Sequence, residues 1–245
     1  MKHEIRKSLA LAILSMALPT TTQLHAATVI SGSLTASFDQ ATFGYLGLTN
    51  LNFFDQADNN LTAAQLLTES GAAGWSGLEF GINGSIVNSP SGRTLQPTSF
   101  TYAPGNLTGT ASGQIGLGGV TRWDVDPMAG GGEFLLGDYS LQYDAARAGG
   151  VYSGWYLINH LSYSAIAFDF ANTTSPVVSA NGFSFSGDLY VRADSGLSLF
   201  GFPSDVSYGT FSLNASTVPE PGTAGLLLLA AGAGVYLAGL RRAKA

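Results

Sequence analysis

Acidic side chains between positions 124 and 144 are the first residues whose types and spacing could support chemistry. Asp124 and Asp126 are separated by one residue, and strand residues two apart point to the same face of a sheet. Two carboxylates on one face offer the oxygen ligands that Ca²⁺ prefers. The segment from Asp55 to Asn60 invites the same reading, but neither follows the spacing of an EF-hand loop. We interpret these acids as solvated turn residues, with Asp124 and Asp126 as the calcium candidates and no other cofactor.

His160 is the one histidine between residues 27 and 221. Without a second histidine or a cysteine, a zinc site would rest mainly on carboxylates, which is unusual. A Ser-His-Asp triad is formally possible, but the segment Gly74–Leu78 lacks the final glycine of a nucleophile elbow. We interpret His160 as a strand residue, assign no catalytic residue and expect a protein that is not an enzyme.

Carbohydrate chemistry gives two alternatives to that expectation. Two carboxylates at a suitable separation would serve glycoside hydrolysis, but sequence does not show distances between them. Trp75, Trp123 and Trp155 could act as sugar-stacking platforms, although large aromatic residues in a β domain more often belong to its core. A secreted carbohydrate-active enzyme and a calcium-dependent carbohydrate-binding module therefore stay open.

The segment Val218–Ala245 contains an apolar run, Thr223 to Leu240, of 18 residues without a charge. As a helix, with a rise of 1.5 Å per residue, this run covers roughly 27 Å, about the hydrocarbon thickness of a bilayer. Backbone groups in lipid must be paired within the segment, so the run predicts a transmembrane helix at 223–240. The basic tip, residues 241–245, should stay in the cytoplasm, which places the chain before Val218 across the membrane.

Pro219, Glu220 and Pro221 stand just before this run, and Arg241 and Arg242 follow it. Residues 218–245 resemble the PEP-CTERM sorting signal of Gram-negative bacteria. The resemblance implies that exosortase, a membrane-embedded protease, reads the proline-flanked glutamate and removes the helix, after which the protein is released or re-anchored. It also implies an association with exopolysaccharide and biofilm. Proline geometry independently favours an extended, non-helical strip here.

The N-terminus has the features of a secretory signal peptide. Three basic residues lie within the first seven positions, and a ten-residue apolar run from Leu9 to Leu18 follows. Ten residues are too few to span a bilayer. A small residue at the cut completes the pattern, so we expect export through the Sec translocon and cleavage after Ala26, with Ala27 as the next choice.

Charge and cysteine content limit the function of the part between these signals. Residues 1–26 carry a net +2 and residues 222–245 a net +3, so of the chain's −6 the part between them holds −11, with four arginines and no lysine. Nucleic-acid binding is excluded, because it depends on neutralising phosphates. The absence of cysteine excludes thiol catalysis, and the exported protein must be stable without disulfides.

Alternation of apolar and polar residues dominates this middle part and predicts antiparallel strands with one wet face. The clearest case is 183–192, where Phe183, Phe185, Leu189 and Val191 share one side. Further strands are expected at 30–38, 78–82, 139–144, 162–170 and 210–214. Repeated short strands separated by turn residues favour a single β-sandwich or jelly-roll-like domain.

One helix is expected within the domain, from Leu61 to Glu69, with Asn60 as its N-cap and Gly71 as its stop. Leu66 and Leu67 should be buried.

The sequence thus predicts a signal peptide at 1–26, a β-sandwich domain at 27–217 and a sorting signal at 218–245, with Ser216–Val218 as a short tether. The precursor should be held at the inner membrane before the protein reaches the cell surface. We expect a structural or adhesive role in extracellular polysaccharide.

Overall fold

A computed structural model describes residues 26–219, which form one compact unit that contains its own hydrophobic core. A segment with its own core can fold by itself. The strands are β1 (Ala27–Phe38), β2 (Leu48–Phe54), β3 (Leu78–Ile82), β4 (Thr101–Tyr102), β5 (Ile115–Gly118), β6 (Val120–Val125), β7 (Gly132–Gly137), β8 (Ser140–Gly149), β9 (Tyr152–Asn159), β10 (Ala165–Ala171), β11 (Val177–Ser179), β12 (Gly182–Tyr190) and β13 (Ser207–Pro219). The helices are α2 (Gln40–Tyr45), η1 (Gln56–Asp58), α3 (Ala63–Leu66), η2 (Pro127–Ala129) and α4 (Gly196–Leu199).

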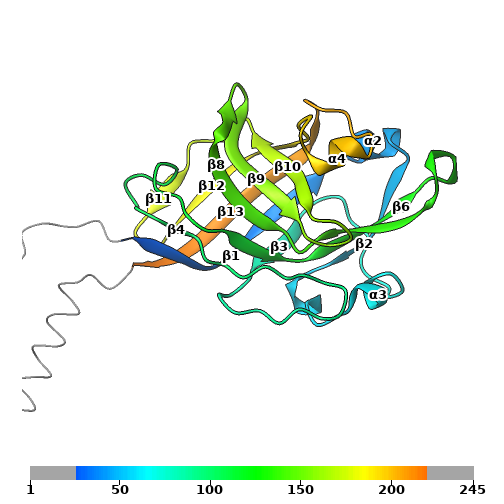
Figure 1. Ribbon diagram of the computed structural model, residues 1–245, viewed down its shortest axis with the longest axis horizontal. Coiled ribbons are helices and arrows are strands. Elements are labelled where there is room, and N and C mark those ends of the chain that lie inside the picture. Colours follow the sequence, from blue (N-terminus) through cyan, green and yellow to red (C-terminus); the bar gives the residue numbers. More distant parts are fainter. Residues whose placement is uncertain (1–25, 220–245) are drawn as a thin grey trace, which may run out of the picture. The chain divides into compact units, whose positions relative to one another are not determined.

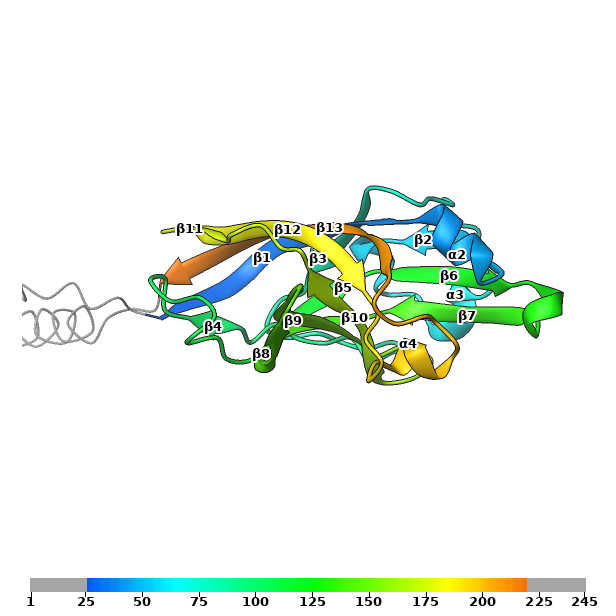
Figure 2. The same ribbon diagram turned by 90° about the horizontal axis from the view of Figure 1, so that it is seen from above.

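Most strands belong to one antiparallel sheet that closes on itself (Figures 1 and 2). Its order is β10-β9-β8-β5-β3-β1-β13-β12-β11, and β10 also pairs with β12, which closes eight strands into a barrel-like ring. The second sheet, β2-β6-β7, has three strands. The expected mainly β, antiparallel architecture is confirmed. It differs from a sandwich because the β10–β12 pairing joins into one sheet the layers that a sandwich would keep as two.

The predicted buried faces are largely confirmed. Phe183, Phe185, Leu189 and Val191 are all buried, as are Leu78, Phe80 and Ile82 of β3. Ile30 is the exception, because it is 49% exposed although Leu34, Ala36 and Phe38 of the same strand are buried. A β-bulge between Val29 and Ser31 adds one residue and reverses which positions face the core.

Gly32 follows this bulge with φ +128, and a Cβ there would collide with the Asn214 carbonyl oxygen of β13. The close approach of the two backbones therefore requires glycine.

The predicted helix is correct in place but wrong in extent. It covers Ala63–Leu66 only, because Thr62 forms a capping box with Gln65 and takes the N-cap position expected for Asn60. Leu66 is buried, but Leu67 is 40% exposed at the C-cap. The sequence pattern also missed α2 and α4, which are too short to produce a periodic signal.

The two ends of the described chain lie side by side. β1 pairs with β13 along its whole length, and Ala27 lies opposite Pro219 (Figure 1). The expected tether, Ser216–Val218, is wrong, because these residues are paired with β1 as part of a strand that continues to Pro219. Within residues 26–219 no helix has the length and apolar character needed to cross a membrane, and the expected helix at 223–240 lies outside the described residues.

A buried ion pair connects the long segment between β3 and β4 to the corner between β7 and β8. The side chains of Arg93 and Asp138 are 1% and 0% exposed, and two N–H groups of Arg93 donate to the Asp138 carboxylate at 3.0 and 2.6 Å. Arg93 also donates to the Asp58 and Leu61 carbonyl oxygens and to the Asn59 side chain. The guanidinium therefore fixes the 58–61 loop against the closed sheet.

Replacing Arg93 by Met should lower the free energy of unfolding by about 3–5 kcal/mol, because it leaves the Asp138 carboxylate buried and unpaired. Urea denaturation of residues 27–219 measures the loss. The double variant R93M/D138N removes both charges and should be more stable than R93M. A loss below about 1 kcal/mol for R93M would contradict a structural role for this pair.

Candidate functional site

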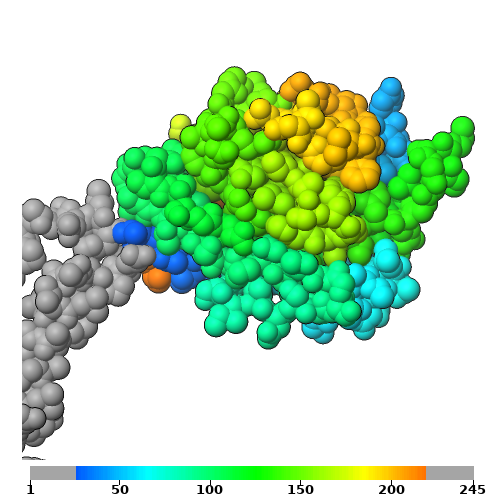
Figure 3. Space-filling view, viewed as in Figure 1, coloured from blue at the N-terminus to red at the C-terminus, as the bar shows by residue number. Residues whose placement is uncertain are grey.

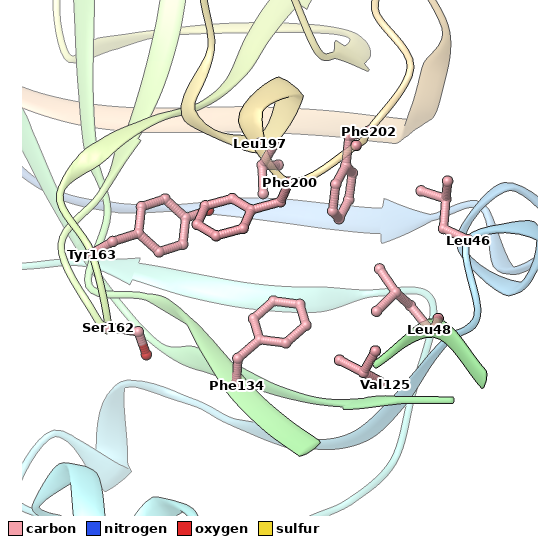
Figure 4. A pocket seen from close by; sticks show the side chains of 11 residues that line it. Leu46, Leu48, Val125, Phe134, Ser162, Tyr163, Leu197, Phe200 and Phe202 are labelled. Atoms are coloured by element: carbon pink, nitrogen blue, oxygen red, sulfur yellow. The ribbon is translucent and has the colours of Figure 1, made fainter. Parts of the chain in front are cut away.

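The candidate site is an apolar cavity of about 570 Å³ (Figure 4). It lies between the three-stranded sheet and residues 196–202, which comprise α4 and the turn after it and are called the α4 segment below. Its size lies within the range of small-molecule sites. It is lined by Leu46, Leu48, Val125, Ala129, Phe134, Ser162, Tyr163, Leu197, Phe200, Gly201 and Phe202.

Two opposed surfaces form the cavity. Leu48, Val125 and Phe134 rise from β2, β6 and β7 of the three-stranded sheet toward Leu197 and Phe202, which descend from the α4 segment (Figure 4). Register explains the lower surface, because Leu48 pairs with Val125 and opposed residues of antiparallel strands share a face.

The cavity has a buried inner end and an open outer end. Leu48, Leu197 and Phe202 are buried, whereas Ala129 and Gly201 are exposed. Phe200 is 65% exposed and its ring lies 5.1 Å from that of Tyr163, centroid to centroid. The α4 segment carries this rim and lies beside the tip of the β6–β7 hairpin, away from residues 26 and 219 (Figure 3).

The polar atoms of this region are few, and several are unsatisfied. The hydroxyl groups of Tyr163 and Tyr139 are buried and have no hydrogen-bond partner among the described residues. Burial raises the pKa of both phenols, so both are neutral at physiological pH. Asn50, which lies on the same face of β2 as Leu48, has a buried side-chain amide without a partner among those residues. Tyr139 and Asn50 do not line the cavity, and the buried Tyr163 hydroxyl does not open into it.

The cavity lining has no carboxylate, histidine, lysine or arginine. All four arginines of residues 26–219 are already paired with carboxylates elsewhere in the domain. The site can therefore bind an apolar molecule but has no side chain to neutralise an anion. Sequence reasoning missed it. The sequence signal for this cavity is the cluster of apolar residues between Leu197 and Phe202, in a segment bounded by turn residues.

The calcium candidates do not share a strand face. Asp124 lies on β6, opposite Thr49 of β2 and Glu133 of β7. Asp126 lies beyond the strand end, where its carboxylate accepts the Met128 N–H at 2.7 Å and caps η2. Among residues 26–219 no group of three or more acidic, histidine or cysteine side chains is placed to hold a metal ion.

His160 lies one residue beyond β9. Its Nε2 is 2.9 Å from the Ser140 hydroxyl, and its Nδ1 is 3.4 Å from the Ser164 hydroxyl. Ser140 is fully buried, and the second ring nitrogen faces a hydroxyl rather than a carboxylate. The arrangement is a hydrogen-bonded link between β8 and the loop that follows β9.

The tryptophans contribute to the core. Trp123 is 0% and Trp155 2% exposed, and Trp75 packs partly buried against the same core. Trp123 stacks on Phe43 of α2 at 4.5 Å between ring centroids, which fixes α2 against the three-stranded sheet. Trp123 and Trp155 are therefore too deeply buried to act as sugar platforms, and Trp75 is partly exposed.

The most extensive surface ion-pair network joins β8, β10 and the loop before α4. Arg147 donates to both carboxylate oxygens of Asp169 and to Asp194. Asp169 is 1% exposed, and this burial raises its pKa, while the hydrogen bonds from Arg147 lower it. The network holds the α4 loop against the closed sheet.

Of the predicted processing residues, the structure describes Ala26, Ala27 and Pro219. Ala27 is the first residue of β1 and is buried, and Pro219 is the last residue of β13. Glu220, Pro221, Arg241 and Arg242 lie outside the described residues.

No protein-family model, curated protein or solved structure matches this chain. The fold and the cavity therefore have to be interpreted from their own geometry.

Calcium binding at Asp124 and Asp126 stays a prediction with a simple test. If Ca²⁺ binds there, millimolar CaCl₂ should raise the Tm of residues 27–219, and EDTA should reverse the change, because a ligand that binds the folded state stabilises it. D124N should remove the effect, and E79Q, an exposed position of β3 outside both candidate segments, serves as the control. A Tm that is insensitive to both additions would remove calcium from consideration.

His160 should make stability depend on pH. Burial lowers its pKa below the value of about 6.5 that it has in the unfolded chain. The unfolded state therefore binds the proton more readily, so this contribution to stability is complete above about pH 6.5 and is lost as the pH falls through the folded-state pKa.

Urea denaturation of wild-type and H160Q domains between pH 5 and 8 isolates this contribution. The unfolding free energy of the wild type minus that of H160Q should rise from pH 5 to 7 and then level off. A constant difference would contradict the predicted shift.

Proposed function

We propose that this chain is an exported cell-surface or extracellular-matrix protein, sorted by an exosortase-type system, with a structural or adhesive role in exopolysaccharide or biofilm. In this proposal residues 1–26 form a signal helix removed after passage through the Sec translocon. Residues 223–240 form a membrane-spanning helix that holds the precursor at the inner membrane. Exosortase then acts at Pro219, Glu220 and Pro221.

The observation that carries the proposal is the pairing of Ala27 with Pro219. The predicted signal peptide ends at Ala26, just before β1, and the predicted sorting motif begins at Pro219, the last residue of β13. Both could be removed without disturbing a strand pairing before Pro219, because every strand from β1 to β13 finds its partners within residues 27–219. A folded domain with both processing sites at one end suits cleavage at a membrane surface.

The charge of the domain supports an extracellular matrix role over nucleic-acid binding. The part between the two predicted signals is strongly acidic, and each of its four arginines forms an ion pair with a carboxylate. Attachment to a polysaccharide would then depend on hydroxyl and amide groups, or on bridging divalent cations, rather than on basic residues.

The sorting proposal predicts two cleavages that intact-mass analysis of the protein from its own bacterial host can detect. The mature product should begin at Ala27 or the next residue and should lack residues 222–245. E220A should keep the apolar segment and remain with the membrane fraction, because the recognition glutamate is gone.

P127A is the matched control, since it changes a proline in an exposed turn of the domain, and it should be processed normally. A soluble native product that still carries Arg241 and Arg242 would contradict the proposal, as would normal processing of E220A.

A further inference from the structure

We propose that the cavity between the three-stranded sheet and the α4 segment binds a neutral, mainly apolar small molecule, such as a medium-chain alcohol. The inference rests on the described residues alone and does not depend on how the protein is sorted.

The lining sets the apolar character of the ligand. Nine of the eleven lining residues are hydrophobic or glycine, and the other two are Ser162 and Tyr163, whose hydroxyl is buried. The lining comes from the chain after α2, from strands β2, β6 and β7 and from the loops around 163 and 200, which meet only in the folded state. An apolar molecule entering the cavity would remove both its own surface and this lining from water.

The Tyr163 side chain contributes apolar surface rather than a polar group. Its ring lies beside Phe200 within the cavity wall (Figure 4), but its hydroxyl is buried and so is closed off from a ligand in the cavity. Ser162 is then the one lining residue whose hydroxyl could reach a ligand.

The charges of the protein exclude an anionic ligand. Transfer of a carboxylate into an apolar site without a cation is strongly unfavourable, and the lining offers no cation. The net charge of −11 between the two signals would also repel an anion from the entrance. A neutral ligand meets neither obstacle.

Exposed apolar residues at the entrance support the same conclusion. Phe200 and Leu199 are 65% and 86% exposed on consecutive positions of the α4 segment. Exposed apolar side chains that adjoin an apolar cavity are typical of ligand-binding grooves.

The first test uses N-phenyl-1-naphthylamine, an uncharged apolar fluorophore with one N–H group, and residues 27–219. Its fluorescence should increase on binding with a saturable, one-site dependence. A129W should weaken binding at least tenfold, because the indole would fill the exposed end of the cavity. A146W, the matched alanine-to-tryptophan change in an exposed strand segment outside the lining, should bind as the wild type does.

The second test examines the charge preference. 1-Decanol should displace the fluorophore at a concentration at least tenfold lower than decanoate at pH 8, because the lining has no cation to neutralise a carboxylate.

Each comparison has an outcome that would overturn the proposal. Absence of saturable fluorophore binding would do so, as would equal binding by A129W and A146W. Equal competition by decanoate and decanol would refute the neutral-ligand assignment.

Discussion

The antiparallel pairing of β1 with β13 is the constraint on which the rest of the structure depends. It joins the first and last strands of the described chain over the full length of β1. Within the closed sheet this pair is flanked by β3 on one side and β12 on the other. The 12 residues of β1 span roughly 40 Å at the usual rise per residue. One end of this ribbon therefore holds Ala27 and Pro219, and the other leads to α2 and the cavity.

The length of this two-stranded ribbon separates the predicted processing sites from the cavity. Processing sites would lie at one end of the domain, and the cavity lies at the other, where α2 and the α4 segment cover the end of the closed sheet (Figures 1 and 2). The sorting proposal and the ligand proposal are thus compatible, although each rests on its own residues.

Few basic residues maintain this arrangement, and all four arginines are engaged in ion pairs. Arg93 saturates its donors on Asp138 and the 58–61 loop, while Arg147 holds the α4 loop through Asp169 and Asp194. Because no arginine of the domain is left without a carboxylate partner, its surface carries uncompensated negative charge. Stability without disulfides then comes mainly from the large aromatic core around Phe43, Trp123 and Trp155.

Sequence alone determined the antiparallel β class and most buried faces, because alternation is a local, period-two property of each strand. It also predicts terminal signals from patterns of charge and apolar length. Tertiary structure decided the rest. A single bulge at Ile30 reversed the facing of half a strand, the β10–β12 pairing closed the sheet, and Tyr163 met Phe134 across a cavity. Such outcomes depend on contacts between distant residues, which no local period encodes.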